Sequence, residues 1–170
     1  ELGKQVITCA STGNAASSLA GLAASVGVST VIFVPETAPK AKIAQLMMHG
    51  AQVFMVKGSY DQAYDLCLQA SAEWGWYNRN SGYNPYLSEG KKTAALEICE
   101  QLGWKTPDKG FVAVGDGCIL GGLWKGFCDL YELGLIDKRP QMIGVQAAGA
   151  SPLVTAFETG QPVQPLRQIQ

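Results

Sequence analysis

Short apolar runs alternate along the chain with segments whose apolar residues recur at helical spacing. The runs are rich in β-branched residues and are bounded by turn formers, which is typical of strands. Their apolar residues are continuous rather than alternating, and this indicates strands that are covered on both faces. We expect strands at residues 5–10, 29–35, 51–58, 76–80, 110–115 and 141–149.

The segments between these strands have the periodicity of amphipathic helices. Gly27, Gly50 and Gly75 follow three of the segments and are expected to end the helices. Pro39 suits the first turn of the second helix, whereas residues 81–90 are rich in turn formers and predict a loop. We expect helices at residues 14–27, 39–50, 60–75, 90–102, 119–133 and 151–159.

Helical spacing also predicts which side chains face the core. The first helix is expected to bury Leu19, Leu22, Ala23 and Val26. The third helix carries one stripe that consists of Tyr60, Ala63, Tyr64, Cys67, Leu68 and Ser71. The helix at 119–133 is expected to bury Leu120, Leu123, Trp124, Phe127 and Tyr131.

The regular alternation of strand and helix predicts an α/β fold, a three-layer open parallel sheet with helices on both faces. In such sheets, ligands bind at the carboxyl ends of the strands, where each loop leads into the next helix. The loops to inspect are therefore residues 10–14, 35–39, 58–61, 80–90, 115–119 and 147–151.

Composition and charge narrow the classes of function. The 170 residues are 47% apolar and 16% charged, which suits a folded core. The formal net charge of −1 offers no overall attraction to phosphate backbones or anionic lipid. The longest apolar runs fall far short of the ~20 residues that span a bilayer, and no signal-peptide pattern opens the sequence. We expect neither a nucleic-acid partner nor a membrane partner.

Cysteine and histidine usage excludes further classes. The five cysteines are odd in number, widely spread and without a CxxC pair, so neither a disulfide framework nor a zinc site is expected. This usage is typical of a reduced, cytoplasmic protein. His49 is the only histidine, which argues against a histidine-based triad or metal cage. We expect His49 to be an exposed residue at a helix end.

The first loop with chemical potential comprises Ser11, Thr12, Gly13 and Asn14. Two hydroxyls and an amide precede a helix whose first N–H groups are unpaired, and Gly13 is expected to permit a turn that a β-carbon would block. Such a loop suits a carboxylate, which the positive end of the helix dipole also favours. Ordinary N-capping is the alternative, because Ser, Thr and Asn are common N-cap residues.

The second loop follows the strand at 110–115 and comprises Gly115, Asp116, Gly117, Cys118 and Ile119. Its two glycines allow several backbone N–H groups to converge on a phosphate. A simple tight turn is the alternative, because neither a Walker A loop nor a GxGxxG fingerprint is present. Asp116 argues against an anion unless its side chain turns outward or accepts a hydrogen bond from the loop. One carboxylate loop and one phosphate loop on a parallel sheet fit pyridoxal phosphate beside an amino acid.

Several strings of residues resemble the fold-type II, tryptophan synthase β-like family of pyridoxal-phosphate enzymes, and within it the threonine synthase branch. These strings lie at residues 11–17 (STGNAAS), 35–63, 84–98, 114–127 (VGDG followed by KGF) and 144–153 (GVQAAGASPL). The resemblance covers residues 5–157 and implies a fold-type II core that is incomplete at both ends. It also implies pyridoxal 5′-phosphate as cofactor and a small amino acid as substrate.

The resemblance implies a role for each loop. Ser11, Thr12, Gly13 and Asn14 would bind the substrate carboxylate, and Asn14 would also contact the ring oxygen of the cofactor. Asn80 and Ser81 lie in the loop that faces the substrate side chain. The cofactor phosphate would lie on the loop that comprises Gly115, Asp116, Gly117, Cys118 and Ile119, of which Asp116, Cys118 and Ile119 depart from the family's Gly- and Asn-rich pattern.

The resemblance further implies two domains. Residues 10–82 would form the small, mobile domain that holds the substrate carboxylate, and residues 1–9 and 83–170 would belong to the larger cofactor-phosphate domain. The Schiff-base lysine of the family would lie upstream of this chain, because Lys4 has none of the surrounding motif and is expected to be a solvated residue before a strand. No catalytic residue is therefore assigned.

The sequence leaves the activity open between alternatives. The first is a central fragment of a threonine synthase-like lyase that is inactive alone, its parent converting O-phosphohomoserine to threonine and phosphate. The family's basic residue after the N-P pair is missing here, since Tyr86 and Leu87 follow Asn84–Pro85, and Arg79 or Lys91 would have to compensate. This departure favours the second alternative, an ammonia-lyase or dehydratase. The others are a non-catalytic binding module and a chain that associates with itself through exposed sheet edges.

Overall fold

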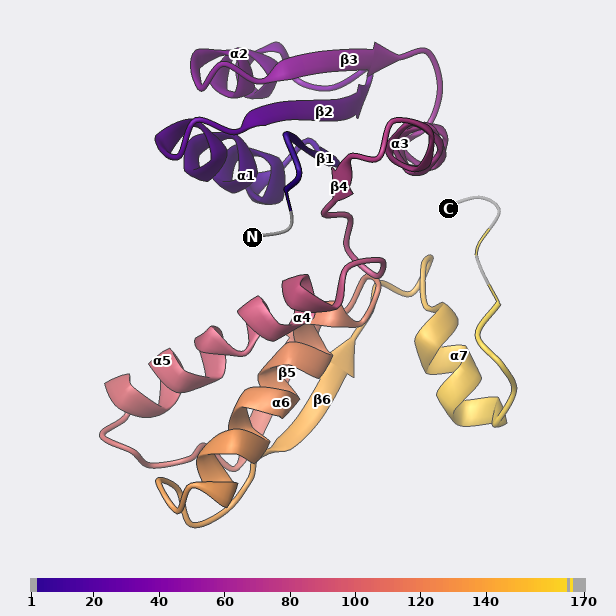
Figure 1. Ribbon diagram of the computed structural model, residues 1–170. Helices are drawn as coiled ribbons and strands as arrows, with labels where there is room; N and C mark the ends of the chain where they lie inside the picture. Colours follow the sequence, from indigo (N-terminus) through magenta and orange to yellow (C-terminus); the bar gives the residue numbers. More distant parts are fainter. Residues whose placement is uncertain (1–2, 165, 167–170) are drawn as a thin grey trace. The chain divides into compact units, whose positions relative to one another are not determined.

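The computed structural model describes residues 3–164 and 166, and it divides into two units between Asn84 and Pro85 (Figure 1). The sequence predicts a boundary near residue 82, but it groups residues 1–9 with the second domain. The structure differs, because residues 6–10 form a strand inside the sheet of the first unit. Residues 1–2, 165 and 167–170 of the expected larger domain lie outside the described residues.

The first unit contains one four-stranded parallel sheet. Its strands are β1 (Val6–Ala10), β2 (Ser29–Pro35), β3 (Gln52–Val56) and β4 (Tyr77–Asn78), in the order β3-β2-β1-β4. All pairs are parallel, with Cys9 opposite Ile32 and Thr8 opposite Asn78. The central strand β1 therefore ends between β2 and β4, and the loops that follow β1 and β4 leave from the same edge of the sheet.

Three helices complete the first unit: α1 (Asn14–Ser25), α2 (Lys40–Met48) and α3 (Tyr60–Glu73). Side chains alternate along β2, so Ile32 and Val34 pack with α1 and α2 whereas Val31 and Phe33 pack with α3. The two clusters lie on opposite faces of the sheet, which gives the three layers expected from the sequence (Figure 1).

Helix α1 packs through smaller residues than the sequence predicts. Its buried side chains are those of Ala16, Leu19, Ala20 and Ala23. Leu22 and Val26, which were expected to face the core, are 66% and 71% exposed. The prediction is wrong at these two positions because a face of alanines lets the helix backbone approach the sheet closely, a gain that a hydrophobicity pattern does not register.

The second unit contains helices α4 (Pro85–Lys91), α5 (Thr93–Gln101), α6 (Cys118–Glu132) and α7 (Pro152–Thr159) and the strands β5 (Lys109–Ala113) and β6 (Gln141–Val145). The two strands pair in parallel, with Phe111 opposite Ile143. Helices α5 and α6 pack their apolar faces together around Cys99 and Phe127. Parallel strands joined by helices confirm the α/β class, but the strands form two sheets rather than the single sheet expected.

Helix α4 occupies part of the segment that was expected to be a loop. Residues 81–83 do form a turn, but the chain becomes helical at Pro85, whose fixed φ suits a first helical position. The turn formers at Ser88 and Gly90 hid this helix from the sequence pattern. Lys92 then separates α4 from α5.

Helix α6 meets α4 and α5 through two glycines. A β-carbon at Gly122 would lie 2.9 Å from the backbone oxygen of Ser88, and one at Gly126 would lie 2.6 Å from that of Lys92. Trp124 and Tyr131, which were expected to be buried, are instead 41% and 42% exposed. Both rings lie under the guanidinium of Arg139, at 5.3 and 5.0 Å from the ring centroids.

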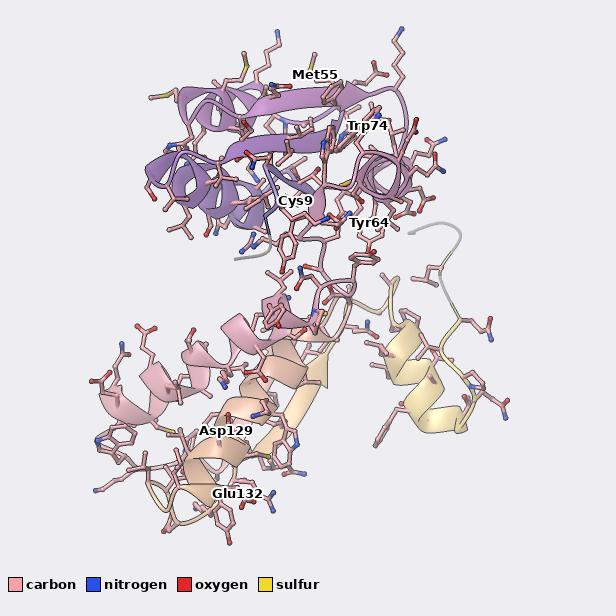
Figure 2. The ribbon with its side chains drawn as sticks, in the orientation of Figure 1. Cys9, Met55, Tyr64, Trp74, Asp129 and Glu132 are labelled. Atoms are coloured by element: carbon pink, nitrogen blue, oxygen red, sulfur yellow. The ribbon has the colours of Figure 1, made fainter. Side chains whose placement is uncertain are left out.

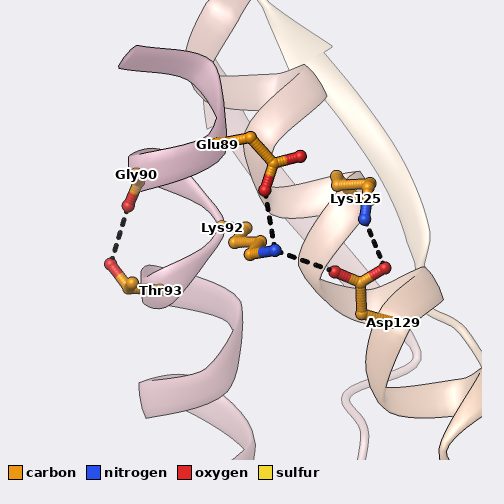
Figure 3. Close-up of polar contacts among 6 residues, drawn as sticks. All are labelled: Glu89, Gly90, Lys92, Thr93, Lys125 and Asp129. Carbon is orange, nitrogen blue, oxygen red and sulfur yellow. Dashed lines mark hydrogen bonds and ion pairs between the residues drawn. The ribbon is translucent and has the colours of Figure 1, made fainter. Parts of the chain in front are cut away.

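A chain of charged side chains also links these helices (Figure 3). The ammonium of Lys92 lies 2.7 Å from the carboxylate of Glu89 and 3.2 Å from that of Asp129. Lys125 lies 2.5 Å from the other oxygen of Asp129, and its hydrogen bond is the main cause that lowers the pKa of Asp129. Because solvent reaches all four side chains, these pairs align the helices more than they stabilise them.

The described residues include no helix with the length and apolar character needed to cross a bilayer. All five cysteines are free thiols. His49 is exposed at the end of α2, as expected, and its ring lies beside Gly21 of α1.

Candidate functional site

The loop between β1 and α1 presents unpaired donors at the edge of the first sheet. The Ser11 hydroxyl accepts a hydrogen bond from the Gly13 N–H at 3.2 Å. Within the described residues, the N–H groups of Asn14 and Ala15 and the side chains of Thr12 and Asn14 have no hydrogen-bond partner. The start of α1 therefore has both a positive helix end and free donors.

The structure does not support side-chain N-capping as the purpose of this loop. The N-cap residue of α1 is Gly13, and no side chain caps the helix. The reason expected for Gly13 is also wrong, because its φ of −113° is open to any residue and a β-carbon there would meet nothing within 4 Å. The fold itself thus tolerates a side chain at Gly13, and what the glycine keeps open is space beside the donors.

Asn80 is the most deeply buried polar residue of the first unit's candidate site, with 1% of its surface exposed. Its side-chain Oδ1 accepts a hydrogen bond from the Ala10 N–H at 2.7 Å. Its Nδ2 is buried and has no hydrogen-bond partner among the described residues. An unpaired buried amide donor is costly, about 1–3 kcal/mol, so this group is a candidate for pairing with an acceptor on a ligand.

Two buried neighbours hold Asn80 in place. The Oδ1 of Asn78 accepts from the Asn80 N–H at 2.8 Å, and the Nδ2 of Asn78 donates to the Ser71 hydroxyl at 2.9 Å. The thiol of Cys67 lies 3.9 Å from Asn80 Oδ1 and 3.4 Å from the Thr8 hydroxyl. Burial raises the pKa of Cys67 although its hydrogen bonds with Thr8, Asn80 and Asn78 oppose the shift, so its thiol is neutral at physiological pH.

Cys9 is also buried under this edge of the sheet (Figure 2). Burial raises the pKa of its thiol to about 12, with a smaller contribution from Cys67, and the nearby Arg79 guanidinium opposes the shift. Arg79 donates from Nη1 to the Ala15 carbonyl oxygen at 3.1 Å. Arg79 thus places a positive charge beside the first turn of α1.

The loop between β5 and α6 has a different construction. Gly117 is the N-cap of α6 with a φ of 84°, a left-handed conformation that favours glycine. A β-carbon at Gly115 or Gly117 would meet nothing within 4 Å. The N–H groups of Ile119 and Leu120 have no acceptor among the described residues, so they are open to a phosphate oxygen.

Asp116 occupies one donor of this loop. Its Oδ1 accepts a hydrogen bond from the Cys118 N–H at 2.9 Å. This is one of the two arrangements in which an anion near Asp116 was expected to be possible. The carboxylate satisfies the helix start but leaves a negative charge beside it. The loop fits a phosphate through the remaining N–H groups, in competition with Asp116.

The structure brings together Ser11, Thr12, Gly13, Asn14, Asn80 and Ser81 at one edge of the first unit. The residues Gly115, Asp116, Gly117, Cys118 and Ile119 form the start of α6 in the second unit. Lys4 is exposed, as expected, and its ammonium donates to the Gly75 carbonyl oxygen at 2.8 Å.

Sequence reasoning treated Tyr60 and Tyr64 as core residues and missed their hydroxyl contacts. Tyr60 donates to the Ala10 carbonyl oxygen at 3.1 Å, and Tyr64 donates to that of Ser81 at 3.0 Å. Figure 2 shows Tyr64 on α3. Their spacing of four residues on a helix that also carries Cys67 and Ser71 was the available signal, because so many polar groups are unusual on a buried stripe.

The chain is similar to known proteins along nearly its whole length. Residues 1–168 match the family model of pyridoxal-phosphate dependent enzymes. The chain is 45% identical over 158 residues to threonine synthase of Methanocaldococcus jannaschii, covering 92% of this chain and 39% of that protein. It is 39% identical over 162 residues to threonine synthase of Mycobacterium tuberculosis, covering 95% of this chain and 44% of that protein. The chain thus spans about two fifths of the length of these relatives.

Solved structures share the fold. Threonine deaminase isoform 2 from Solanum lycopersicum superimposes with a TM-score of 0.83 at 24% identity, over 99% of this chain and 44% of that one. Maize serine racemase gives a TM-score of 0.80 at 19% identity, over 99% of this chain and 49% of that one. At these identities the likeness concerns the fold alone.

Proposed function

Because the chain belongs to the pyridoxal-phosphate-dependent enzymes, we propose that it carries the substrate loops and the cofactor-phosphate loop of a threonine synthase-like lyase. The parent reaction would convert O-phosphohomoserine and water to threonine and phosphate. The chain spans less than half of its relatives' length, so this activity is proposed for the whole enzyme.

One observation carries the proposal for the first unit, the buried Nδ2 of Asn80 without a partner. Asn80 accepts a hydrogen bond from the N–H of Ala10, the residue that precedes the Ser11–Asn14 loop. The N–H groups of Asn14 and Ala15, at the end of this loop, are also unpaired among the described residues. Donors that converge without acceptors suit an anionic ligand. We assign the substrate carboxylate to Ser11, Thr12, Gly13 and Asn14, and an oxygen on the substrate side chain to Asn80 and Ser81.

In the second unit, the phosphate of pyridoxal 5′-phosphate would bind to the loop Gly115–Ile119. The supporting features are the left-handed Gly117 and the open N–H groups at the start of α6. When bound, the cofactor withdraws electrons from the α-carbon of an amino acid and so makes the α-proton acidic.

We propose that this chain alone binds ligands without turnover. Proton transfer at the α-carbon needs a lysine in this family, and the lysine nearest to the start of β1, Lys4, is exposed and bonded to the Gly75 carbonyl. That contact supports a structural role for Lys4. The proposed function of the chain is therefore tested by binding and not by catalysis.

The test is a titration of the isotope-labelled chain followed by NMR. O-phosphohomoserine should shift the amides of Ser11–Asn14 and the Asn80 side-chain amide, and pyridoxal phosphate should shift those of Gly115–Ile119. L-homoserine, which lacks the phosphate, is the matched control for the substrate side chain. No change in either loop at millimolar ligand would refute the proposal.

A second activity has one observation in its favour. Leu87 and Ser88 follow Asn84–Pro85–Tyr86 where the threonine synthase branch has a basic residue, and this favours an ammonia-lyase or dehydratase that takes an unphosphorylated amino acid. Arg79, beside the first turn of α1, is the cation that would compensate in a threonine synthase. Equal affinity for homoserine and its phosphate would support the ammonia-lyase.

Self-association of the chain is also proposed. Phe111 of β5 is 70% exposed, and Phe54 and Met55 of the edge strand β3 are 48% and 61% exposed. Exposed apolar side chains on strands favour pairing with a second copy. Light scattering should show a dimer or larger species, and a monomer at high concentration would contradict this.

A further inference from the structure

We infer that Tyr60 and Tyr64 are positioning residues that hold the two candidate substrate loops, one hydroxyl for each loop. The inference rests on the proposed function, because it assigns these tyrosines to the same substrate site. Neither tyrosine is placed in contact with the ligand. Each acts through the backbone of a loop. Both lie on one stripe of α3, which also carries Cys67 and Ser71.

Tyr60 completes a set of hydrogen bonds that fixes the end of β1. The Ala10 N–H donates to Asn80 Oδ1 at 2.7 Å, and the Ala10 carbonyl accepts from the Tyr60 hydroxyl at 3.1 Å. The next N–H, that of Ser11, donates to the Phe33 carbonyl at 3.2 Å. The N–H and the carbonyl of Ala10 and the N–H of Ser11 are therefore all engaged at the entrance to the Ser11–Asn14 loop. The hydrogen bond from Tyr60 to the Ala10 carbonyl is the contact in this set that ties the end of β1 to α3.

Tyr64 acts on the other loop in the same way. Its hydroxyl donates to the Ser81 carbonyl at 3.0 Å. The preceding carbonyl, that of Asn80, accepts from the N–H groups of Tyr83 and Asn84, each at 3.2 Å. The turn that begins at Asn80 is thus closed on itself and is tied to α3 through Tyr64.

A capping box stabilises the start of helix α3, from which these two contacts are made. Ser59 and Gln62 form a capping box, in which the Gln62 N–H donates to the Ser59 hydroxyl at 3.2 Å and the Ser59 N–H donates to Gln62 Oε1 at 2.8 Å. Tyr60 is the first residue of the helix and Tyr64 lies one turn later. Their rings are 6.3 Å apart, so the two hydroxyls are held on the same side of the helix.

The stripe continues below the tyrosines. Cys67 contacts the Thr8 hydroxyl and Asn80 Oδ1, and Ser71 accepts from Asn78. Positions 60, 64, 67 and 71 follow the helical repeat, and each binds β1, β4 or the loop after one of them. A single helix face therefore sets the separation between the Ser11–Asn14 loop and the Asn80–Ser81 turn.

The experiment compares Tyr60→Phe, Tyr64→Phe and the double variant with the unmodified chain. Phenylalanine keeps the ring and removes only the hydroxyl. Tyr131→Phe is the matched control, because Tyr131 is 42% exposed against 45% for Tyr60 and its ring contact with Arg139 does not need the hydroxyl. Thermal unfolding of each variant reports the stability of the fold.

The first readout is amide hydrogen exchange without ligand. Loss of one hydrogen bond should speed local exchange about 3- to 10-fold. Tyr60→Phe should do so at Ser11 and Gly13 and Tyr64→Phe at Tyr83 and Asn84, each leaving the other loop nearly unchanged. Tyr131→Phe should change neither. Unchanged exchange in both loops would overturn the inference, and uniform acceleration across the first unit would also overturn it, because that indicates general destabilisation.

The second readout is the affinity for O-phosphohomoserine. Each tyrosine variant should bind several-fold more weakly at a temperature where it is still fully folded, and the double variant should lose less than the product of the two factors because both loops serve one ligand. Unchanged affinity would overturn the inference. The unmodified chain could fail to bind O-phosphohomoserine while the exchange pattern appears as expected. That result would refute the proposed function but would still show that Tyr60 and Tyr64 position the two loops.

Discussion

The side-chain oxygen of Asn80 accepts the backbone N–H of Ala10 at 2.7 Å, which joins two segments that are 70 residues apart in sequence. Without this bond, the end of the central strand β1 would have an unpaired N–H in a buried place. The same side chain leaves Nδ2 unpaired. Asn80 is thus at once a support of the fold and the strongest candidate for ligand contact.

Replacing Asn80 by alanine should lower the free energy of unfolding of the first unit by about 1–3 kcal/mol, because the Ala10 N–H loses its acceptor. Asn14→Ala is the control, since Asn14 is exposed and its replacement should change stability by no more than about 0.5 kcal/mol. Urea unfolding followed by amide signals of residues 3–84 measures both. Equal stability of the two variants would contradict the role of Asn80.

Gly13→Ala and Gly117→Ala should separate stability from binding. Gly13 has a φ of −113° and open space, so alanine should leave stability unchanged or raise it slightly, while its methyl group should weaken amino-acid binding several-fold. Gly117 has a φ of 84°, so alanine there should cost about 1–2 kcal/mol. Thermal unfolding and NMR titration check the pair. A Gly13→Ala chain that binds normally would argue against ligand approach at this position.

Asp116→Asn should strengthen phosphate binding at the start of α6. Asparagine retains an oxygen for the Cys118 N–H but removes the negative charge beside the helix end, so affinity for inorganic phosphate or pyridoxal phosphate should rise about two- to fivefold. Asp137→Asn, an exposed position in the same unit, should have no effect. An unchanged affinity in Asp116→Asn would mean that the phosphate does not bind at this helix end.

Stability should fall as the pH rises above about 9. Burial raises the pKa of Cys9 from its ordinary value of 9.0 to about 12, so between these values the unfolded chain loses a thiol proton that the folded chain keeps. The folded state then binds more protons than the unfolded state, and the free energy of unfolding decreases with pH in that window. Urea unfolding between pH 8 and 11 should show a shallower decrease for Cys9→Ala. Identical slopes would assign the alkaline loss to other groups.

The sequence predicts the elements of this protein better than their arrangement. The alternating strands and helices are confirmed because continuous apolar runs and helical periodicity are local properties. The division of the strands between two sheets depends on contacts far apart in sequence, such as Thr8 with Asn78. Helix α4 was missed for the same kind of reason. Ser88 and Gly90 have weak local helix preference, and the segment packs against α6, which is distant in sequence.

The candidate site could be located from sequence, but its internal contacts could not. The Ser11–Asn14 and Gly115–Ile119 loops were identifiable because polar and glycine residues follow apolar strands at the edge where ligands bind. The unpaired state of Asn80 Nδ2 emerges only when Oδ1 is seen to be engaged by Ala10. The tyrosine contacts of α3 were hidden because aromatic residues on a helical stripe usually indicate packing.

Gly122 and Gly126 restrict which sequences can replace this one. Any β-carbon at either position would overlap backbone atoms of Ser88 or Lys92, which cannot rotate out of the way as a side chain can. A library with every substitution at each position of α6 should therefore show two intolerant sites one helical turn apart, next to permissive exposed sites such as Trp124. The loop that precedes α6 has space for added side chains, but Gly122 and Gly126 within α6 allow almost no substitution.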